Sequence, residues 1–460
     1  MLTRTQNGAL SCQTTNPLVA LYFNLIDIDN VDDDNYIPIL ESAWRYDKRA
    51  TLVLLYDLRN CRGGKGRRKL FYQCITYLLK EHKIPVRILN HLSHYGYFKD
   101  YQHIHALYPI DEVYVNTFVK HLSEDFIKVL FVDKPGKVRI SLAAKYAPNN
   151  KQPFAKEIRN RMRLSAQQYR LVLTTLRSHL NIVETKSCKQ QWDQIDYSIV
   201  SSLAFLKHKK SFKSHDGERF NQFIENKGKI NVGQLYPHQI VKLLFDRDTD
   251  ACEMFDQYLN KHRNMLKDCV IVCDTSGSMM NGNNEARPID VAIALTLMAA
   301  CNNQGAFHNT FFTFSSESEL VSIIGDNWID RVHNISTTSW GNSTNIQSVF
   351  DQLLKYNEDI KNVIVISDMQ FDLCNESSTN FEEIEKKYTS LGRKRPNFVF
   401  WNVSGIGSDI PVRESEKGVV LVSGYSASLF KLIAEGDENI TPLAFVEMVV
   451  NHPMYERIIL

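Results

Sequence analysis

A buried strand that runs straight into a polar loop constrains this chain more than any other feature. Residues 269–273 are Cys-Val-Ile-Val-Cys, and Asp274, Ser276 and Ser278 follow at alternate positions. The apolar run is typical of a buried parallel strand, and the loop after such a strand is a common ligand site. With Gly277 permitting a tight turn, this spacing presents one carboxylate and two hydroxyls to a common point. Oxygen ligands of this kind indicate Mg²⁺ or another divalent cation.

Two later segments supply the remaining parts of the predicted site. Thr344 stands at the start of an amphipathic helical run that ends near Lys355, and Asp368 follows a second apolar strand at residues 363–367. The carboxyl ends of parallel strands lie on one edge of a sheet. We therefore expect five side chains to converge there: Asp274, Ser276, Ser278, Thr344 and Asp368. The alternative interpretation is a serine-rich turn after an ordinary strand.

The order and spacing of these residues resemble the metal-ion-dependent adhesion site of von Willebrand factor A domains. The resemblance implies that the hydroxyls of Ser276, Ser278 and Thr344 coordinate the cation. It also implies that Asp274 and Asp368 hold these hydroxyls or bound waters. An acidic side chain of a protein partner then completes the coordination sphere, and the metal binds rather than reacts.

The composition is that of an ordinary globular chain. Its 460 residues are 43% hydrophobic and 23% charged, which is enough for two or three cores. No apolar run reaches membrane-spanning length, and residues 1–10 lack the apolar core of a signal peptide. The nine cysteines are odd in number and show no Cys-x-x-Cys spacing, which predicts free thiols and no zinc. We expect a cytoplasmic protein with no membrane partner.

Hydrophobic periodicity divides the chain into three parts. Residues 1–15 are polar and aperiodic, which predicts a flexible arm. Residues 16–262 carry apolar side chains at three- and four-residue spacing, which favours an irregular, HEAT-like α-helical solenoid over a closed bundle. Residues 266–460 alternate strands with helices, which predicts a doubly wound, mostly parallel sheet; the resemblance above implies that this domain is of the von Willebrand A type. The fold class is therefore multidomain, α followed by α/β.

The near-neutral total charge hides a division along the chain. Residues 1–267 carry 41 Lys and Arg against 27 Asp and Glu, whereas residues 268–460 carry 13 against 25. A basic first part indicates that this part meets a polyanion. The alternative is that the two parts attract each other across a domain interface.

The densest basic cluster lies around three glycines at residues 63, 64 and 66. Its six cations are Arg59, Arg62, Lys65, Arg67, Arg68 and Lys69. It does not fit a P-loop, because a helix precedes it and no Ser or Thr follows the Gly-Lys pair. Two interpretations remain equally open, namely a solvated turn between helices and an edge where glycines let a nucleic-acid backbone approach. Three further candidate phosphate contacts are Lys137, Arg139 and Lys145. His91, His94, His103 and His105 are interpreted as surface and packing residues rather than metal ligands.

Several stretches resemble a domain-of-unknown-function family in which a helical region precedes a von Willebrand A-like domain. They include Leu58 to Gly66, Ser141 to Pro148, Ser367 to Asp372 and Phe400 to Asn402, and the resemblance covers residue 16 to the end. The architecture is similar to that of the TROVE proteins, the Ro autoantigens, in which a ring of helical repeats binds small or misfolded RNA. The resemblance implies an RNA-binding scaffold and no catalysis.

Three functions follow, in decreasing order of support. The first is a non-enzymatic scaffold that binds RNA or ribonucleoprotein through the basic helical part. The second is an adaptor that binds an acidic residue of a partner protein through Mg²⁺. The third is an enzyme whose metal activates water, but no nucleophile-base pair, second metal set or phosphate loop accompanies the predicted ligands.

Overall fold

The computed structural model describes most of the chain and divides it into two compact units. The described residues are 2–5, 7–12, 16–26, 33–131, 138–263, 265–280, 286–314, 317–336, 344–356, 358, 360–404, 410–434 and 439–460. Unit 1 comprises Met1–Phe71 and Leu235–Glu456, and unit 2 comprises Tyr72–Gln234 and Arg457–Leu460. This division differs from the predicted boundary at residues 262–266. The reason is that the segments before and after residues 72–234 in the chain both pack within unit 1. Residues 17–24 contact the edge strand of its sheet, and residues 237–261 contact the helix at residues 288–302.

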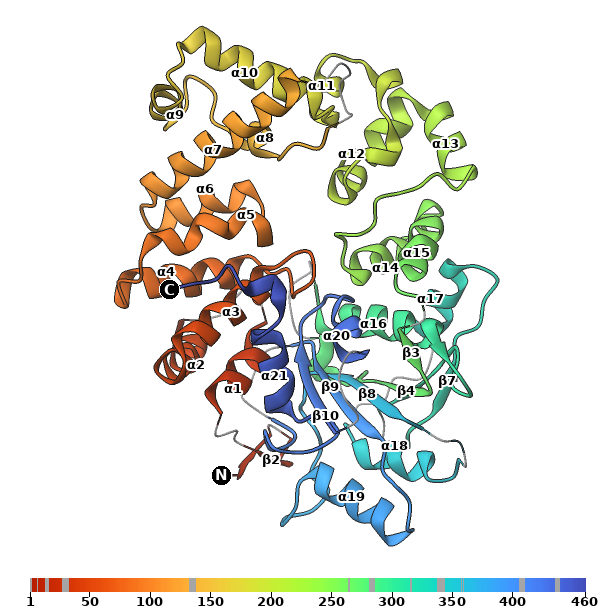
Figure 1. Cartoon of the computed structure of the whole chain (residues 1–460). Coiled ribbons are helices and arrows are strands. Elements are labelled where there is room, and N and C mark those ends of the chain that lie inside the picture. Colours follow the sequence, from red (N-terminus) through yellow and green to blue (C-terminus); the bar gives the residue numbers. More distant parts are fainter. Residues whose placement is uncertain are drawn as a thin grey trace. The chain divides into compact units, whose positions relative to one another are not determined.

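A six-stranded sheet forms the core of unit 1 (Figure 1). Its strands are, in spatial order, β10 (Val419–Ser423), β9 (Asn397–Asn402), β8 (Asn362–Ser367), β4 (Cys269–Cys273), β6 (Thr310–Thr313) and β7 (Leu320–Ser322). All neighbours are parallel except the edge strand β7, which is antiparallel to β6. The prediction of a mostly parallel sheet is therefore confirmed. A second, two-stranded sheet pairs β3 (Leu266–Lys267) with β5 (Asn303–Gln304).

Helices cover both faces of this sheet. Successive side chains of a strand point to opposite faces, so Phe398 and Trp401 of β9 lie on different sides. The Phe398 ring contacts Phe350 of α18 (Ile346–Leu353) and Phe381 of α19 (Asn380–Ser390). The Trp401 ring contacts Phe430 of α20 (Leu429–Ala434) on the other side. The long helix α16 (Pro288–Asn302), almost entirely buried, packs against β4, β6 and β8.

The first helices of the chain complete unit 1. Helix α1 (Pro17–Asn24) begins at the Asn16 side chain, which accepts hydrogen bonds from two backbone amides of its first turn. Together with α21 (Pro442–Val450) it packs against the edge strand β10. The other helical elements of this unit are α2 (Asp33–Tyr46), α3 (Lys48–Arg59), the start of α4 (Lys69–Glu81), α14 (Pro237–Phe245), α15 (Asp250–Lys261), η4 (Gly277–Met280), α17 (Trp328–Ser336) and η5 (Pro453–Tyr455).

The predicted flexible arm contains ordered structure. Strands β1 (Leu2–Arg4) and β2 (Leu10–Cys12) form an antiparallel ribbon, with Gly8 in its turn. Single bridges join Gly8 to Asp372 and Cys12 to Ile410. These long-range bridges pair backbone groups of the ribbon with distant parts of the chain. Pairing of this kind leaves no hydrophobic periodicity in a short polar sequence, so the sequence did not indicate it. The expectation of a loose arm is corrected here for the described residues 2–5 and 7–12.

Unit 2 is helical, and none of its described residues belongs to a strand. Its elements are the remainder of α4, η1 (Val86–His91), α5 (Leu92–Tyr95), α6 (Phe98–Leu107), α7 (Asp111–Leu130), α8 (Ala143–Tyr146), α9 (Ala155–Arg161), α10 (Ala166–His179), α11 (Val183–Cys188), η2 (Trp192–Gln194), η3 (Tyr197–Ile199), α12 (Ser202–His215) and α13 (Gly217–Glu225). Aromatic rings fill its cores. Phe118 and Phe154 both contact Tyr114 of α7, and a second cluster gathers Phe205, Phe212 and Phe220.

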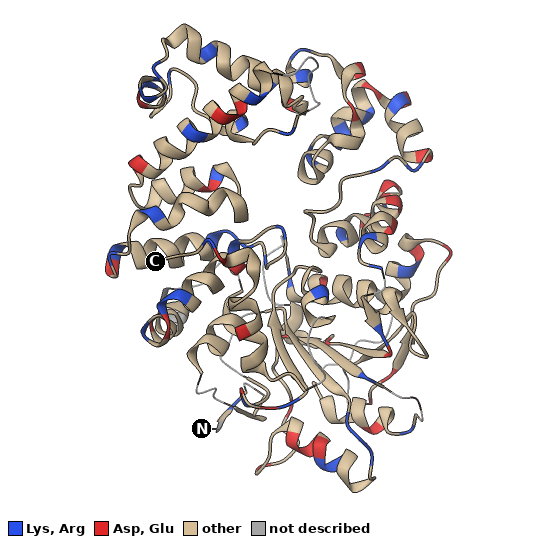
Figure 2. Ribbon diagram, viewed as in Figure 1, with Lys and Arg blue, Asp and Glu red and all other residues tan. Residues whose placement is uncertain are grey.

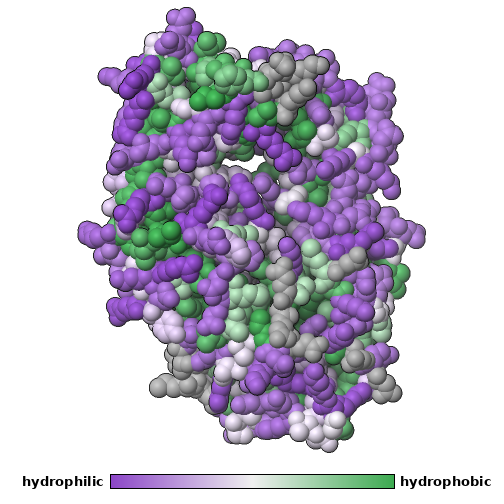
Figure 3. Space-filling view, in the orientation of Figure 1, coloured by the Kyte–Doolittle hydropathy of each residue, from purple (hydrophilic) through white to green (hydrophobic). Residues whose placement is uncertain are grey.

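Hydrophilic residues predominate on the face of the molecule drawn in Figure 3, with smaller hydrophobic patches among them. This agrees with the burial of the apolar side chains of the central strands and of α16. Within the described part of the chain, no helix combines the length and the apolar character that crossing a bilayer requires.

Candidate functional site

Two neighbouring central strands, β4 and β8, deliver the main residues of the predicted metal site. Asp274 directly follows β4 and its backbone amide still donates to the Ile366 carbonyl at 2.9 Å, which continues the ladder between the strands. The chain then turns through η4, which carries Ser278. Strand β8 ends at Ser367, and Asp368 follows it. The predicted convergence at the carboxyl edge of the sheet is found for these strands.

Four of the five predicted side chains form one hydrogen-bonded cluster. Asp274 Oδ1 accepts from the Ser276 amide at 2.9 Å, and the hydroxyl oxygens of Ser276 and Ser278 lie 3.0 Å apart. The Ser278 hydroxyl also bonds the carboxylate of Asp368. Asp274, Ser276 and Asp368 are at most 5% exposed, whereas Ser278 is partly exposed. The cluster is therefore buried on one side and accessible on the other.

The two carboxylates of this cluster oppose each other electrostatically. Burial raises the pKa of Asp274, and the nearby charge of Asp368 raises it further. Burial likewise raises the pKa of Asp368, against the hydrogen bond from Ser278. Two buried acids whose charges repel each other are a donor set that a divalent cation would stabilise. A cation between them would also accept the serine hydroxyls as oxygen ligands.

Thr344 has different partners from the other four. Its hydroxyl lies 2.7 Å from the Gln370 carbonyl and 2.8 Å from Asp372 Oδ1, and its amide donates to Asp372 Oδ2 at 2.8 Å. Asn7 of the N-terminal ribbon donates to the same hydroxyl oxygen at 3.0 Å. None of the described hydrogen bonds joins Thr344 to Asp274 or to the serines. Residues 340–343, which precede it in the predicted loop, lie outside the described residues.

Sequence reasoning missed two residues that hold predicted site residues in place, Ser367 for Asp274 and Asp372 for Thr344. Ser367 Oγ donates to Asp274 Oδ2 at 2.5 Å, and it also accepts from the Met369 amide. Asp372 fixes Thr344 as described above. The signal for both was present in the segment 367–372, where a serine ends a strand and two acids come after it, but nothing in their spacing separates a ligand from its support.

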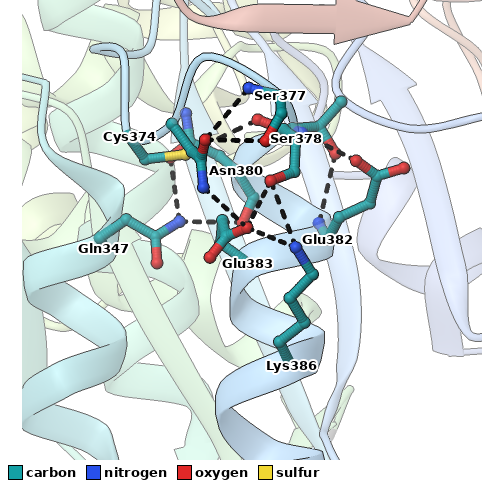
Figure 4. A network of polar contacts seen from close by, with 10 residues as sticks. Gln347, Cys374, Ser377, Ser378, Asn380, Glu382, Glu383 and Lys386 are labelled. Carbon is teal, nitrogen blue, oxygen red and sulfur yellow. Dashed lines mark hydrogen bonds and ion pairs between the residues drawn. The ribbon is translucent and has the colours of Figure 1, made fainter.

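A polar network at the start of α19 anchors the Asp372 segment (Figure 4). The side-chain Nδ2 of Asn380 donates to the Asp372 carbonyl at 3.0 Å, and Nε2 of Gln347 in α18 donates to Asn380 Oδ1 at 2.9 Å. Beside them Glu383 accepts from Ser378 and from Lys386. The network ties the starts of α18 and α19 to the loop after β8. The candidate site is therefore backed by fixed polar contacts.

Two details of the prediction change. A Cβ on Gly277 would meet no atom within 4 Å, and its φ lies outside the left-handed region, so the turn does not require glycine. The helix after Thr344 begins later than predicted, with Asn345 as its N-cap. The described residues contain no group of three or more His, Cys, Asp or Glu placed to hold a metal. A cation here would depend on two carboxylates and on hydroxyls, which is a hard-cation set.

The basic cluster at residues 59–69 is partly buried, which corrects part of its assignment. Arg59 and Lys65 are 0% and 1% exposed, so neither is available to a phosphate. Lys65 Nζ donates to the Tyr22 carbonyl, to the Leu25 carbonyl at 3.3 Å and to Ser423 Oγ at 2.7 Å. These carbonyls belong to the end of α1, where backbone acceptors lack helical partners. The segment is a turn between helices, but the interpretation of a solvated turn does not hold for Arg59 and Lys65, which are buried.

The other predicted phosphate contacts have mixed environments. Arg62, Arg68, Lys69 and Arg139 are exposed. Arg67 is half-buried over the Tyr425 ring at 4.4 Å, and Lys145 pairs with Glu184 at 2.9 Å. Lys137 lies outside the described residues. The exposed members remain predictions.

The fold and the cluster together define an α/β protein with a polar site at the carboxyl edge of its sheet, joined to a helical unit. The chain belongs to the family described as Domain of unknown function (DUF2828), which matches residues 5–117 and 149–270. Domain of unknown function (DUF7788) matches residues 268–451. An uncharacterized protein of Acanthamoeba polyphaga mimivirus is 30% identical over 499 residues, covering 95% of this chain and 85% of that protein. The crystal structure of the Deinococcus radiodurans RO (RSR) protein is similar with a TM-score of 0.44 and 12% identity, over 92% of this chain and 99% of that one.

Proposed function

We propose that this protein is a non-enzymatic scaffold that binds RNA or ribonucleoprotein through unit 2. One observation carries the proposal. Unit 2 contains 27 Lys and Arg against 14 Asp and Glu, whereas unit 1 contains 27 against 38. Unit 2 therefore has a net positive charge. Unit 1 has a net negative charge, although it contains the basic glycine-rich cluster at residues 59–69. A polyanion is the partner that such a charge attracts, and RNA is the proposed one.

Helix α12 is the clearest basic surface of unit 2. Lys207, Lys210 and Lys213 are exposed on it at three-residue spacing, and the helix contains no acidic residue. Figure 2 shows Lys and Arg on this helix and along the other helices of the unit. Three-residue spacing keeps the three side chains on one side of the helix. Lysines in this arrangement contact phosphates without reading sequence.

The test measures RNA affinity of the full chain as a function of salt. We expect wild-type protein to bind a small structured RNA with an affinity that falls steeply with salt, and Lys207→Gln, Lys210→Gln, Lys213→Gln together to reduce the salt slope by about 3. The matched control replaces three exposed lysines of unit 1, Lys355, Lys394 and Lys417, and is expected to leave the slope unchanged. Absence of salt-sensitive binding by wild type would refute the proposal.

The second candidate is an Mg²⁺-dependent adaptor for a partner protein. The cluster of Asp274, Ser276, Ser278 and Asp368 at the sheet edge favours it, because its buried acids and half-open face suit a cation that a partner carboxylate completes. We propose that these residues hold Mg²⁺ in the manner of a von Willebrand A adhesion site. Bound there, the cation would supply an acceptor for an acidic side chain. Thr344 would join the set through a rearrangement of its present hydrogen bonds.

Affinity capture from cell extract tests the adaptor. Partners captured with Mg²⁺ and lost with a chelator support it, and Asp274→Ala is expected to lose the same partners. An Asp274→Ala protein that keeps every partner would exclude this function. The RNA and adaptor functions use different units and are compatible.

A further inference from the structure

A basic pocket lies within unit 2, apart from helix α12 and from the candidate metal site. It has a volume of about 300 Å³ and its ionisable lining residues are all bases: His91, His94, Lys120, His121 and Arg457. Two asparagines and Thr117 complete the lining. No acid takes part, so every side chain of the lining can donate a hydrogen bond to an anion.

The pocket is built from three segments that are far apart in sequence. His91 ends η1, His94 lies in α5, and α7 contributes Lys120 and His121 one turn after Thr117. The C-terminal segment adds Arg457, whose Nη1 lies 3.1 Å from His94 Nε2. Its neighbour Ile458 is 3% exposed and so anchors the segment. The basic groups are thus gathered by the fold and not by local sequence.

The walls of the pocket are held by contacts beneath it. The Tyr101 hydroxyl donates to the Leu89 carbonyl at 3.0 Å and bonds the Thr117 side chain, which links α6, η1 and α7. The Phe98 ring packs edge-on against the His121 ring with centroids 5.0 Å apart. A preformed arrangement of donors loses little freedom when a ligand enters.

The charge balance favours an anion over a metal. Burial lowers the pKa of His91, and the charges of Arg457 and Lys120 lower it further. These same cations would repel a metal ion placed among the imidazoles. Asp125, the buried acid near His121, is engaged elsewhere, because the Ser141 amide donates to both of its carboxylate oxygens at 3.0 and 3.1 Å.

We propose that this pocket binds a phosphate group, carried by a small free phosphate ester or by the end of an RNA chain. Lys120 and Arg457 supply positive charge and hydrogen-bond donors. The imidazoles and Thr117 supply directional hydrogen bonds. The inference does not depend on RNA binding by the rest of unit 2, because phosphate alone tests it.

The experiment titrates the full chain with inorganic phosphate, with adenosine 5′-monophosphate, and with one short RNA bearing either a 5′-phosphate or a 5′-hydroxyl. Calorimetry gives the affinities, and NMR follows the imidazole protons. We expect phosphate to bind at one site and to shift the signals of His91, His94 and His121. Lys120→Gln with Arg457→Gln should weaken binding at least about tenfold, whereas the matched exposed pair Lys99→Gln with Lys156→Gln should not.

The results of these titrations identify the molecule that carries the phosphate. A preference for the 5′-phosphorylated RNA that the pocket variants abolish assigns the phosphate to an RNA end. Binding of phosphate and the nucleotide without that preference assigns it to a small ester. Absence of phosphate binding, equal loss in both pairs of variants, or zinc binding by the three histidines in place of phosphate would each overturn the proposal.

Discussion

The Nζ of Lys65 lies 2.7 Å from the Oγ of Ser423 at the end of β10, although 358 residues separate them in sequence. The same ammonium bonds the last carbonyls of α1 and lies 4.1 Å from the Tyr22 ring centroid. The glycine-rich loop therefore sends its lysine into the core of unit 1. This contact joins the first helices of the chain to the last strand of the sheet.

Removing this lysine is expected to cost stability and not RNA affinity. Lys65→Met removes the donor to the Leu25 carbonyl and one of the two donors to the Tyr22 carbonyl, which keeps the hydrogen bond from Ser423 Oγ at 2.8 Å. It also leaves Asp57 without its nearby cation, so we expect a loss of about 3 kcal/mol in the free energy of unfolding. Urea denaturation measures it. The control Lys69→Met, exposed in the same segment, is expected to change stability by less than about 0.5 kcal/mol. A variant of normal stability that loses RNA binding would contradict the structural role.

The buried lysine also predicts a pH dependence of stability. Burial lowers the pKa of Lys65 from 10.5 to about 7, with Asp57 opposing the shift. Between these values the unfolded chain binds a proton that the folded chain has released. The free energy of unfolding therefore rises with pH across this window, by at most about 1.4 kcal/mol per unit.

The free energy of unfolding is measured at pH 7.5 and pH 9 for wild type and for Lys65→Met. The contribution of Lys65 is the difference between the two proteins, because the tyrosines and cysteines that they share cancel. Asp57 acts at lower pH and in the opposite sense. Burial raises its pKa above 3.8, so the stability that its protonated form contributes is present below pH 3.8 and is lost as the pH rises through the folded value. Equal slopes in the two proteins would show that Lys65 keeps its proton throughout.

Gly64 and Gly63 provide a matched test of the loop. A Cβ on Gly64 would lie 2.3 Å from the Asp57 carbonyl oxygen, whereas on Gly63 its nearest atom is the flexible Met454 Cε at 3.1 Å. We expect Gly64→Ala to destabilise unit 1 by about 2–3 kcal/mol and Gly63→Ala by less than about 1 kcal/mol. Thermal unfolding measures both, and similar effects at the two positions would contradict the packing described.

The metal hypothesis predicts a specific stabilisation. At an Mg²⁺ concentration ten times its dissociation constant, the free energy of unfolding of the wild type should rise by about 1.4 kcal/mol relative to the metal-free protein. The Asp368→Asn variant should lose this gain, since the cation loses a charged partner. Ser377→Ala, an exposed serine of the loop before α19, should keep it. A gain of the same size in Asp368→Asn would place the cation elsewhere.

The sheet and the strand-end residues of the candidate site could be predicted from the sequence for a clear physical reason. Strands such as residues 269–273 are fully buried and therefore uniformly apolar, and Asp274 and Asp368 mark where each apolar run ends. The partners of Thr344 were beyond reach, because Asp372 and Asn7 approach it only through the folded loops. A ladder between strands leaves a pattern in the sequence, but a single side-chain hydrogen bond leaves none.

The environment of the basic loop at residues 59–69 could not be predicted from the sequence. Charge alone does not reveal whether a lysine faces water, and Lys65 is buried where the carbonyls of Tyr22 and Leu25, at the end of α1, accept its hydrogen bonds. The pocket around His91 and Arg457 was equally hidden, since its members come from segments more than 300 residues apart. His91 and His94 were interpreted as surface and packing residues, and only the fold shows that Arg457 lies with them in one pocket.

The most direct test of RNA binding by unit 2 is ultraviolet crosslinking in cells followed by mass spectrometry of the peptides that carry RNA. The account predicts crosslinked peptides within residues 72–234, including α12, and few within residues 268–456. Crosslinks confined to the sheet unit, or none above the level of a charge-matched control protein, would contradict it.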